Sequence, residues 1–180
     1  MPILRKGGLP DIRAYFLPQL NFMKNDFDRI QIKIDRGICD TQGKIFEKAC
    51  LDGCDLKLFT NSYMNSVFCK KGMDYKASRY SFEDADTCLD IIYPEIGRCK
   101  GKHSNPDMGY WIGYTYRQLS YEAGISSSNL IKRVPFDLLI RNYAAHHCLD
   151  ENISGEMLCD YYKLGRLPEF IAHDRYLEKV

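Results

Sequence analysis

The sequence predicts a mainly α-helical protein: a single-domain helical bundle with a short β element near the N-terminus. Over most of residues 40–165, apolar side chains recur at spacings of three and four, as on one face of a helix. Glycines and prolines divide this stretch into pieces of helical length. The 180 residues, 45% of them hydrophobic, suffice for one core. We therefore expect one domain, 1–180, with an irregular segment at 1–37, a helical core at 40–165 and a terminal helix at 166–180.

The first 37 residues contain the only pattern that favours a strand. The run RIQIKI, residues 29–34, alternates polar and apolar side chains, which is typical of a half-buried strand. Helical periodicity before it is broken by turn-forming residues, namely Gly7, Gly8, Pro10 and Pro18. We expect one short strand here.

Two helices follow and are expected to form a hairpin. The first covers 40–50 and is predicted to stop at Gly53, a residue that tolerates the backbone conformation of a helix end. The second starts at Leu56 and runs to Lys71, just before Gly72. Lysines in its last turn favour the carbonyl end of the helix.

A third helix is predicted from Ser81 to about Ile92. Ser81 and Asp84 have the spacing of a capping box, in which a side chain accepts a hydrogen bond from a free backbone N–H. The rest of this helix carries an acidic face without an intervening base, formed by Glu83, Asp84, Asp86 and Asp90.

The most distinctive segment is a tyrosine-rich helix at 108–123, ended by Gly124. Tyr110, Tyr114 and Arg117 share one face of it, because they lie four and three residues apart. Such rings either pack in a core or anchor a protein interface. Further helices are expected in SSSNLIKRV, PFDLLIRNYAAHHC and roughly 153–163.

The missing membrane and secretion signals predict a cytoplasmic protein with reduced cysteines. The formal net charge of +1 gives no overall field that would hold a polyanion. We find neither a membrane-spanning apolar run nor a signal-peptide pattern, so we expect a cytoplasmic protein without membrane contact. In that compartment its eight cysteines stay reduced and pack as small apolar groups.

We expect no catalytic residue, no metal and no cofactor, because the phosphate-binding glycine motifs are absent and no cysteine motif stands out. A cysteine- or zinc-dependent enzyme remains an alternative. Cys50 and Cys54, with the His146–Cys148 cluster, are zinc donors in type but lack a tight C-x-x-C knuckle. Cys148 or Cys69 next to a histidine would serve as a nucleophile.

A helix-turn-helix is the other alternative. The segment RQLSYEAGISSSNLIKRV fits the turn and the start of a recognition helix, which would make the protein a DNA-binding regulator and nucleic acid a secondary partner. The residues then expected to face DNA are Ser127, Asn129, Lys132 and Arg133.

The segments KACLDGCDLKLFTNSYMNSVFC, CLDIIYPEI and YWIGYTYRQLSYEAGISSSNLIKRVPFDLLIRNYAAHHCLDE carry a resemblance over about residues 45–160. They resemble small bacterial proteins of gut bacteria and mobile elements with a W-I-G-Y-x-Y-R core and a later Y-x-x-x-H-x-x-D. Cys148 stands where a threonine-like residue is expected. The motif residues here are Trp111, Gly113, Tyr114, Tyr116, Arg117, Tyr143, His147 and Asp150.

This resemblance implies a place in a toxin–antitoxin or phage–host conflict cassette, some of whose proteins are anti-CRISPR inhibitors of Cas nucleases. We therefore expect a non-enzymatic inhibitor that binds a bacterial effector protein, a Cas nuclease or a toxin. An acidic face can occupy a site meant for phosphates, and a basic aromatic stretch lies directly before it. The expected partner-binding residues are Lys70, Lys71, Lys76, Arg79, Glu83, Asp84, Asp86, Asp90, Tyr110, Trp111, Tyr114 and Arg117.

Overall fold

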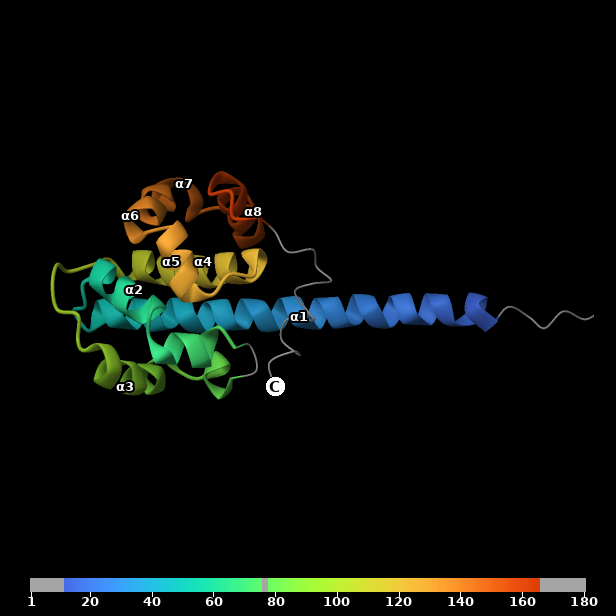
Figure 1. Ribbon diagram of the computed structural model, residues 1–180, viewed down its shortest axis with the longest axis horizontal. Coiled ribbons are helices and arrows are strands. Elements are labelled where there is room, and N and C mark those ends of the chain that lie inside the picture. The colour runs from blue at the N-terminus through green and yellow to red at the C-terminus, as the bar shows by residue number, and fades with distance from the viewer. Residues whose placement is uncertain (1–11, 76–77, 166–180) are drawn as a thin grey trace, which may run out of the picture. The chain divides into compact units, whose positions relative to one another are not determined.

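The computed structural model describes residues 12–75 and 78–165, and in them the prediction of a mainly helical fold is confirmed. These residues form eight α-helices and no strand, with one isolated bridge between Cys54 and Lys100 (Figure 1). The α-helices are α1 (Ile12–Leu51), α2 (Leu56–Met64), α3 (Ala85–Ile96), α4 (Pro106–Ala123), α5 (Ser127–Arg133), α6 (Phe136–Leu139), α7 (Tyr143–His146) and α8 (Glu151–Tyr161). Three short turns of other helical types are η1 (Cys69–Met73), η2 (Arg79–Phe82) and η3 (Ile140–Asn142).

The chain divides into two compact units, Met1–Ile34 and Asp35–Val180. In the first, the described residues all belong to α1, so the strand predicted at 29–34 does not form and residues 12–37 are not irregular. A helix satisfies its backbone groups within itself, whereas a lone strand cannot. Ile30 and Ile32 are more than half exposed, so their alternation buries no face. Residues 1–11 and the terminal helix predicted at 166–180 lie outside the described residues.

The predicted helix stops at Gly53 and Gly124 are confirmed. The backbone N–H of Cys54 donates to the carbonyl of Ala49 at 2.9 Å, while Gly53 takes a φ of +84° that few other residues adopt. Gly124 ends α4 in the same left-handed region, with φ +61°. α4 begins where Asn105 accepts a hydrogen bond from the Asp107 N–H at 2.9 Å, with Pro106 in the first turn.

The end of α2 and the start of α3 differ from prediction. α3 begins at Ala85, because Asp84 rather than Ser81 accepts the hydrogen bond from the backbone N–H of Thr87. Ser81 is buried within η2. The second helix ends at Met64 instead of continuing to residue 71, and a separate π-helical turn, η1, covers Cys69–Met73. The capping-box spacing therefore placed the start of α3 one turn too early.

The core of the second unit is centred on a cluster of aromatic rings from α1 and α2. The ring of Phe46 meets Phe59 edge-on at a centroid distance of 5.1 Å and Tyr63 at 4.9 Å. All three side chains are fully buried. Edge-to-face pairs of this kind favour packing beyond the area that they bury. The predicted pairing of the two helices is thus a packed aromatic contact.

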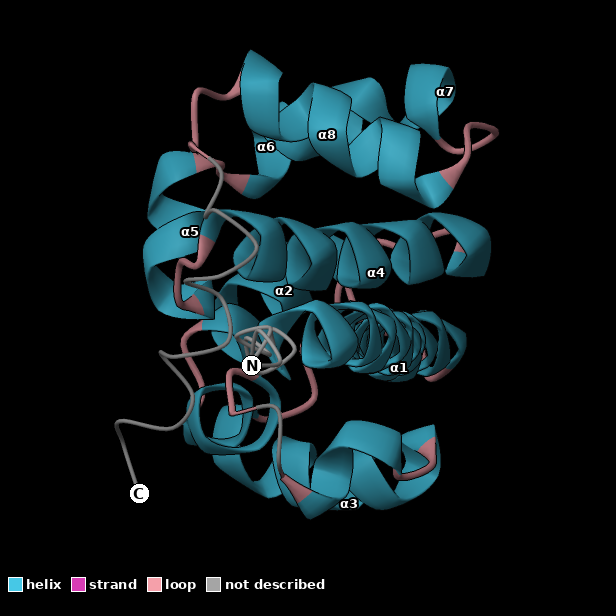
Figure 2. Cartoon of the chain, turned by 90° about the vertical axis from the view of Figure 1, so that its right-hand side faces the viewer, coloured by secondary structure: helices cyan, strands magenta, loops and turns pink. Residues whose placement is uncertain are grey.

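α4 lies in the middle of this unit, between residues 35–51 of α1 and the layer of α6, α7 and α8 (Figure 2). It approaches α1 closely through Gly109 and Gly113, where an added Cβ would meet backbone atoms of Phe46 and Gln42 at 2.9 and 2.6 Å. Two glycines four residues apart thus form one flat side of α4. Its opposite side faces α7 and α8. Among the described residues, no helix has the length and apolar character that crossing a membrane requires.

Candidate functional site

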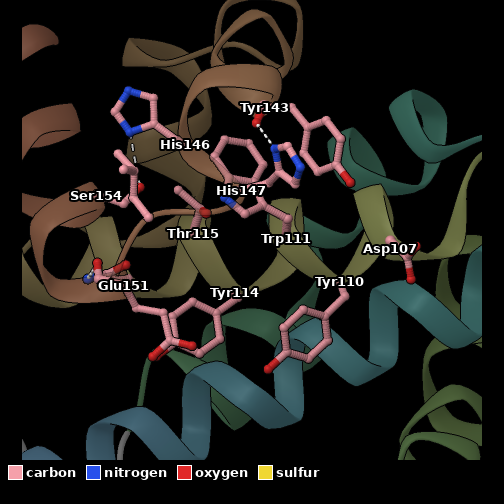
Figure 3. A pocket seen from close by; sticks show the side chains of 12 residues that line it. Asp107, Tyr110, Trp111, Tyr114, Thr115, Tyr143, His146, His147, Glu151 and Ser154 are labelled. Carbon is pink, nitrogen blue, oxygen red and sulfur yellow. Dashed lines mark hydrogen bonds between the residues drawn. The ribbon is translucent and has the colours of Figure 1, made fainter.

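A pocket of about 390 Å³ lies between α4 and the α7–α8 segment (Figure 3). Volumes of this order are at the lower end of those that hold small ligands. The pocket combines aromatic, acidic and histidine side chains. Its lining residues are Asp107, Tyr110, Trp111, Tyr114, Thr115, Gln118, Tyr143, His146, His147, Leu149, Glu151 and Ser154.

Helical spacing explains how α4 lines the pocket. Asp107, Trp111 and Thr115 follow one another at intervals of four, so they share one face of the helix. Tyr110 and Tyr114 form the border between this face and the one that packs on α1, and their ring centroids are 6.0 Å apart. The signal for Asp107 was available in the sequence, because it lies one turn before Trp111, yet we did not single it out.

The far wall is an aromatic stack from α7. The Tyr143 ring meets Trp111 edge-on at 5.5 Å and stacks on the His147 imidazole at 4.7 Å. These three residues belong to the motif that carries the resemblance, and the structure brings them together although α4 and α7 are separate in sequence. His146 turns the other way, and its Nδ1 lies 3.1 Å from Ser154 Oγ (Figure 3).

Carboxylates hold two of the tyrosines in place. The Tyr110 hydroxyl donates to Asp40 Oδ1 at 2.8 Å, and the Tyr114 hydroxyl donates to Glu151 Oε2 at 3.2 Å. Burial, followed by these and neighbouring negative groups, raises the pKa of both phenols. Burial and then the charge of Asp107 likewise raise the pKa of Tyr143. The phenols therefore stay protonated as donors.

Behind α4, Arg117 is fully buried in a polar network. Its Nη1 pairs with Asp74 Oδ1 at 2.7 Å, and its Nε and Nη2 donate to Gln42 Oε1 at 3.0 and 2.8 Å. Nη2 also donates to Ser127 Oγ at 3.0 Å. Burial acts to lower the pKa of Arg117, but Cys69, Tyr121 and Asp74 together raise it well above the ordinary value. Arg117 thus links α1, α4 and α5 and offers no surface to a partner, contrary to our expectation.

The predicted acidic face of α3 is partly engaged within the protein. Asp84 caps the helix through Thr87, and Asp86 pairs with Lys48 at 3.0 Å. Asp90 is exposed, and Glu83 is half-buried. Only Asp86 and Asp90 lie on α3 itself, since Glu83 and Asp84 come before its first residue, and none of the four lines the pocket.

The predicted basic stretch is exposed at Lys70, Lys71 and Arg79, while Lys76 lies outside the described residues. The guanidinium of Arg79 lies over the ring of Tyr80, 4.7 Å from its centroid. Of the aromatic residues predicted to contact a partner, Trp111 and Tyr110 are half-buried at the pocket, and Tyr114 is 7% exposed.

The geometry of α5 does not suit a recognition helix, although Asn129, Lys132 and Arg133 are exposed on it. A recognition helix presents its N-terminal residues to base edges. Here that end is buried: Ser127 is 1% exposed, and its backbone N–H and hydroxyl both donate to Asp74. The helix is also only seven residues long.

Most of the cysteines are buried, and Cys148 is exposed beside a histidine. The Cys148 sulfur lies 3.1 Å from His147 Nε2, and the Tyr143 carbonyl lies 2.9 Å from His147 Nδ1, so a thiol–imidazole pair does exist. Cys148 is exposed, but it does not line the pocket. Burial raises the pKa of the Cys50 thiol to about 12. Within residues 12–75 and 78–165, no group of three or more His, Cys, Asp or Glu side chains could hold a metal ion.

Sequence reasoning missed Glu151, which joins the pocket from the start of α8. It carried no local signal, because its relation to Tyr114 is set only by the packing of α8 on α4. Comparison of the chain with protein-family models, with curated proteins and with solved structures finds no match.

Proposed function

We propose that this protein is a non-enzymatic protein-binding inhibitor of a bacterial conflict system, which neutralises an effector such as a Cas nuclease or a toxin. The observation that carries the proposal is an exposed apolar row on α8 that runs on from the pocket. Leu149 lines the pocket and is 41% exposed. Leu149 lies in the bend before α8, and the row on α8 itself is formed, one turn apart, by Ile153 (55% exposed), Met157 (51%) and Tyr161 (71%).

Residues four apart on a helix lie on one side of it, so these side chains form one continuous surface rather than isolated exposed residues. A contiguous apolar surface next to a pocket is typical of a protein interface. Methionine and tyrosine are also among the residues enriched in such interfaces. An ordinary solvent-facing helix would instead carry charge on this side.

The charges around this row favour a basic partner. From Tyr143 to Tyr161 the chain contains neither lysine nor arginine, whereas its carboxylates are Asp150, Glu151, Glu156 and Asp160. Proteins that act on nucleic acids carry basic clefts for phosphates, and a carboxylate-rich surface complements such a cleft. This supports an effector that acts on nucleic acid as the partner.

Co-expression tests the proposal. The wild-type chain is produced in a bacterial host together with a nucleic-acid-cleaving toxin or a Cas nuclease, and survival or plasmid retention is measured. We expect protection by the wild type and its loss in Met157→Asp. The matched control is Leu58→Asp, which changes an equally exposed residue on α2 and should still protect. If the wild type relieves neither kind of effector, the proposal fails.

A further inference from the structure

We propose that the pocket between α4 and the α7–α8 segment binds the cationic side chain of an arginine or lysine contributed by the partner. This inference rests on the proposed function and names the chemistry of the partner's anchor residue. The walls of the pocket are aromatic, its charged lining residues are carboxylates, and neither lysine nor arginine lines it.

The aromatic walls come from two separate elements. Trp111 and Tyr143 both line the pocket and meet edge to face, with an interplanar angle of 75° (Figure 3). The Tyr110 and Tyr114 rings border it from the side of α1. Cations are attracted to the faces of tryptophan and tyrosine rings, most strongly to tryptophan.

Carboxylates supply the charge. Asp107 lies in the first turn of α4 and Glu151 in the first turn of α8, on opposite sides of the pocket (Figure 3). The raised pKa of Tyr143, due to burial and then to Asp107, agrees with a negative potential at the walls. A phosphate would be repelled by this pair, and neither lysine nor arginine lines the pocket to offset the repulsion.

The size of the pocket also suits one side chain. A volume of about 390 Å³ is near the lower limit for small-molecule sites, and the small side chains of Thr115 and Ser154 also line the pocket. Interface anchors are commonly single arginine or aromatic side chains that fill such a pocket. Leu149 joins the pocket to the α8 row, so a partner lying along α8 would place one of its residues here.

Both carboxylates have a plain structural explanation, which the experiment must separate from binding. An acidic side chain in the first turn of a helix stabilises that helix through the backbone dipoles. A purely structural role would lower thermal stability on substitution, but it would not make the pocket discriminate between charged and neutral ligands.

Trp111 is the only tryptophan of the chain, so its fluorescence reports on the pocket alone. The probes are N-acetyl-arginine methylamide, N-acetyl-lysine methylamide and the neutral arginine isostere N-acetyl-citrulline methylamide. We expect the cationic probes to change the emission in a saturable way and to bind about three to ten times more tightly than citrulline, as a cation–π contact with one partly exposed ion pair implies.

Three variants that each remove one negative charge complete the test. Asp107→Asn and Glu151→Gln should each lower the affinity for the arginine probe by about two- to fivefold, as loss of one partly exposed charge implies. The control Asp137→Asn, on α6 and outside the pocket, should bind it like the wild type. Equal binding of arginine and citrulline probes, absence of saturable binding, or unchanged affinity in both pocket variants would overturn the inference.

The same variants separate this inference from the proposed function. If the wild type protects against an effector while the cationic probes do not bind, the inference fails and the inhibitor role stands. If the probes bind as expected but no effector is neutralised, the pocket stands and the inhibitor role fails.

Discussion

Replacement of Gly113 by alanine tests the packing of α4 on α1 directly. The new Cβ would lie 2.6 Å from the carbonyl oxygen of Gln42 and 2.9 Å from the Cβ of Phe46. Neither atom can rotate away, because one belongs to the helix backbone and the other is attached to it. Overpacking of this kind costs about 1–3 kcal/mol, and we expect the upper end of that range.

Alanine also favours the helix over glycine by about 1 kcal/mol. The net loss in the free energy of unfolding is therefore about 2 kcal/mol. For a chain of this size, that lowers Tm by about 4–8 °C. Thermal unfolding followed by far-UV circular dichroism, with urea denaturation as a second measurement, gives both quantities.

Gly37→Ala is the matched control on α1. Its Cβ would lie 2.7 Å from the ring of Phe82, but this side chain is 62% exposed and can turn aside. We expect stability that is unchanged or up to about 1 kcal/mol higher. If Gly113→Ala unfolds like the wild type or like Gly37→Ala, the close contact of α4 with α1 is not what holds these helices together.

Three further outcomes are expected. Asp74→Ala should reduce the free energy of unfolding in urea by about 3–5 kcal/mol, because it leaves Arg117 charged and buried; a loss no larger than that of the exposed partner in Asp137→Ala would contradict this. Cys148→Ser should still neutralise the effector, whereas loss of protection would favour a cysteine enzyme. Under reducing conditions, the urea concentration at the unfolding midpoint should decrease as the pH is raised from about 8 to 10.5. Thiols ionise near pH 8.5 in the unfolded chain but only at higher pH in the folded protein, so a midpoint that stays constant would argue against thiol burial. The pKa values are raised to about 12 for Cys50, about 11 for Cys69 and about 12 for Cys88.

Helix ends and helical faces could be predicted where a local rule applies. Gly53 and Gly124 end their helices because each takes a positive φ, a property of the residue itself. No such local rule decides between a strand and a helix for residues 29–34. Three alternating isoleucines fit a strand, yet a helix already formed at residues 35–51 extends at little cost, whereas a strand needs a partner.

The site shows where local rules stop. The spacing correctly placed Tyr110, Tyr114 and Arg117 on one face of α4, but it could not say that Arg117 turns into the core towards α1 while the two tyrosines also border the pocket. Gln42 and Asp74 decide the matter, and they lie 75 and 43 residues from Arg117. Glu151 could not be predicted as a pocket residue for the same reason, since its position depends on the packing of α8.

The burial of Arg117 has a consequence for binding at the opposite face of α4. The guanidinium ties α4 to α1 through Gln42 and to α5 through Ser127, while Gly109 and Gly113 bring the helix axes close. A helix held at so many points cannot rotate to present other residues. Trp111 is therefore fixed in orientation before any partner arrives, and its edge-to-face contact with Tyr143 fixes the second wall. A pocket prepared in this way needs little ordering on binding, so more of the contact energy is left for affinity.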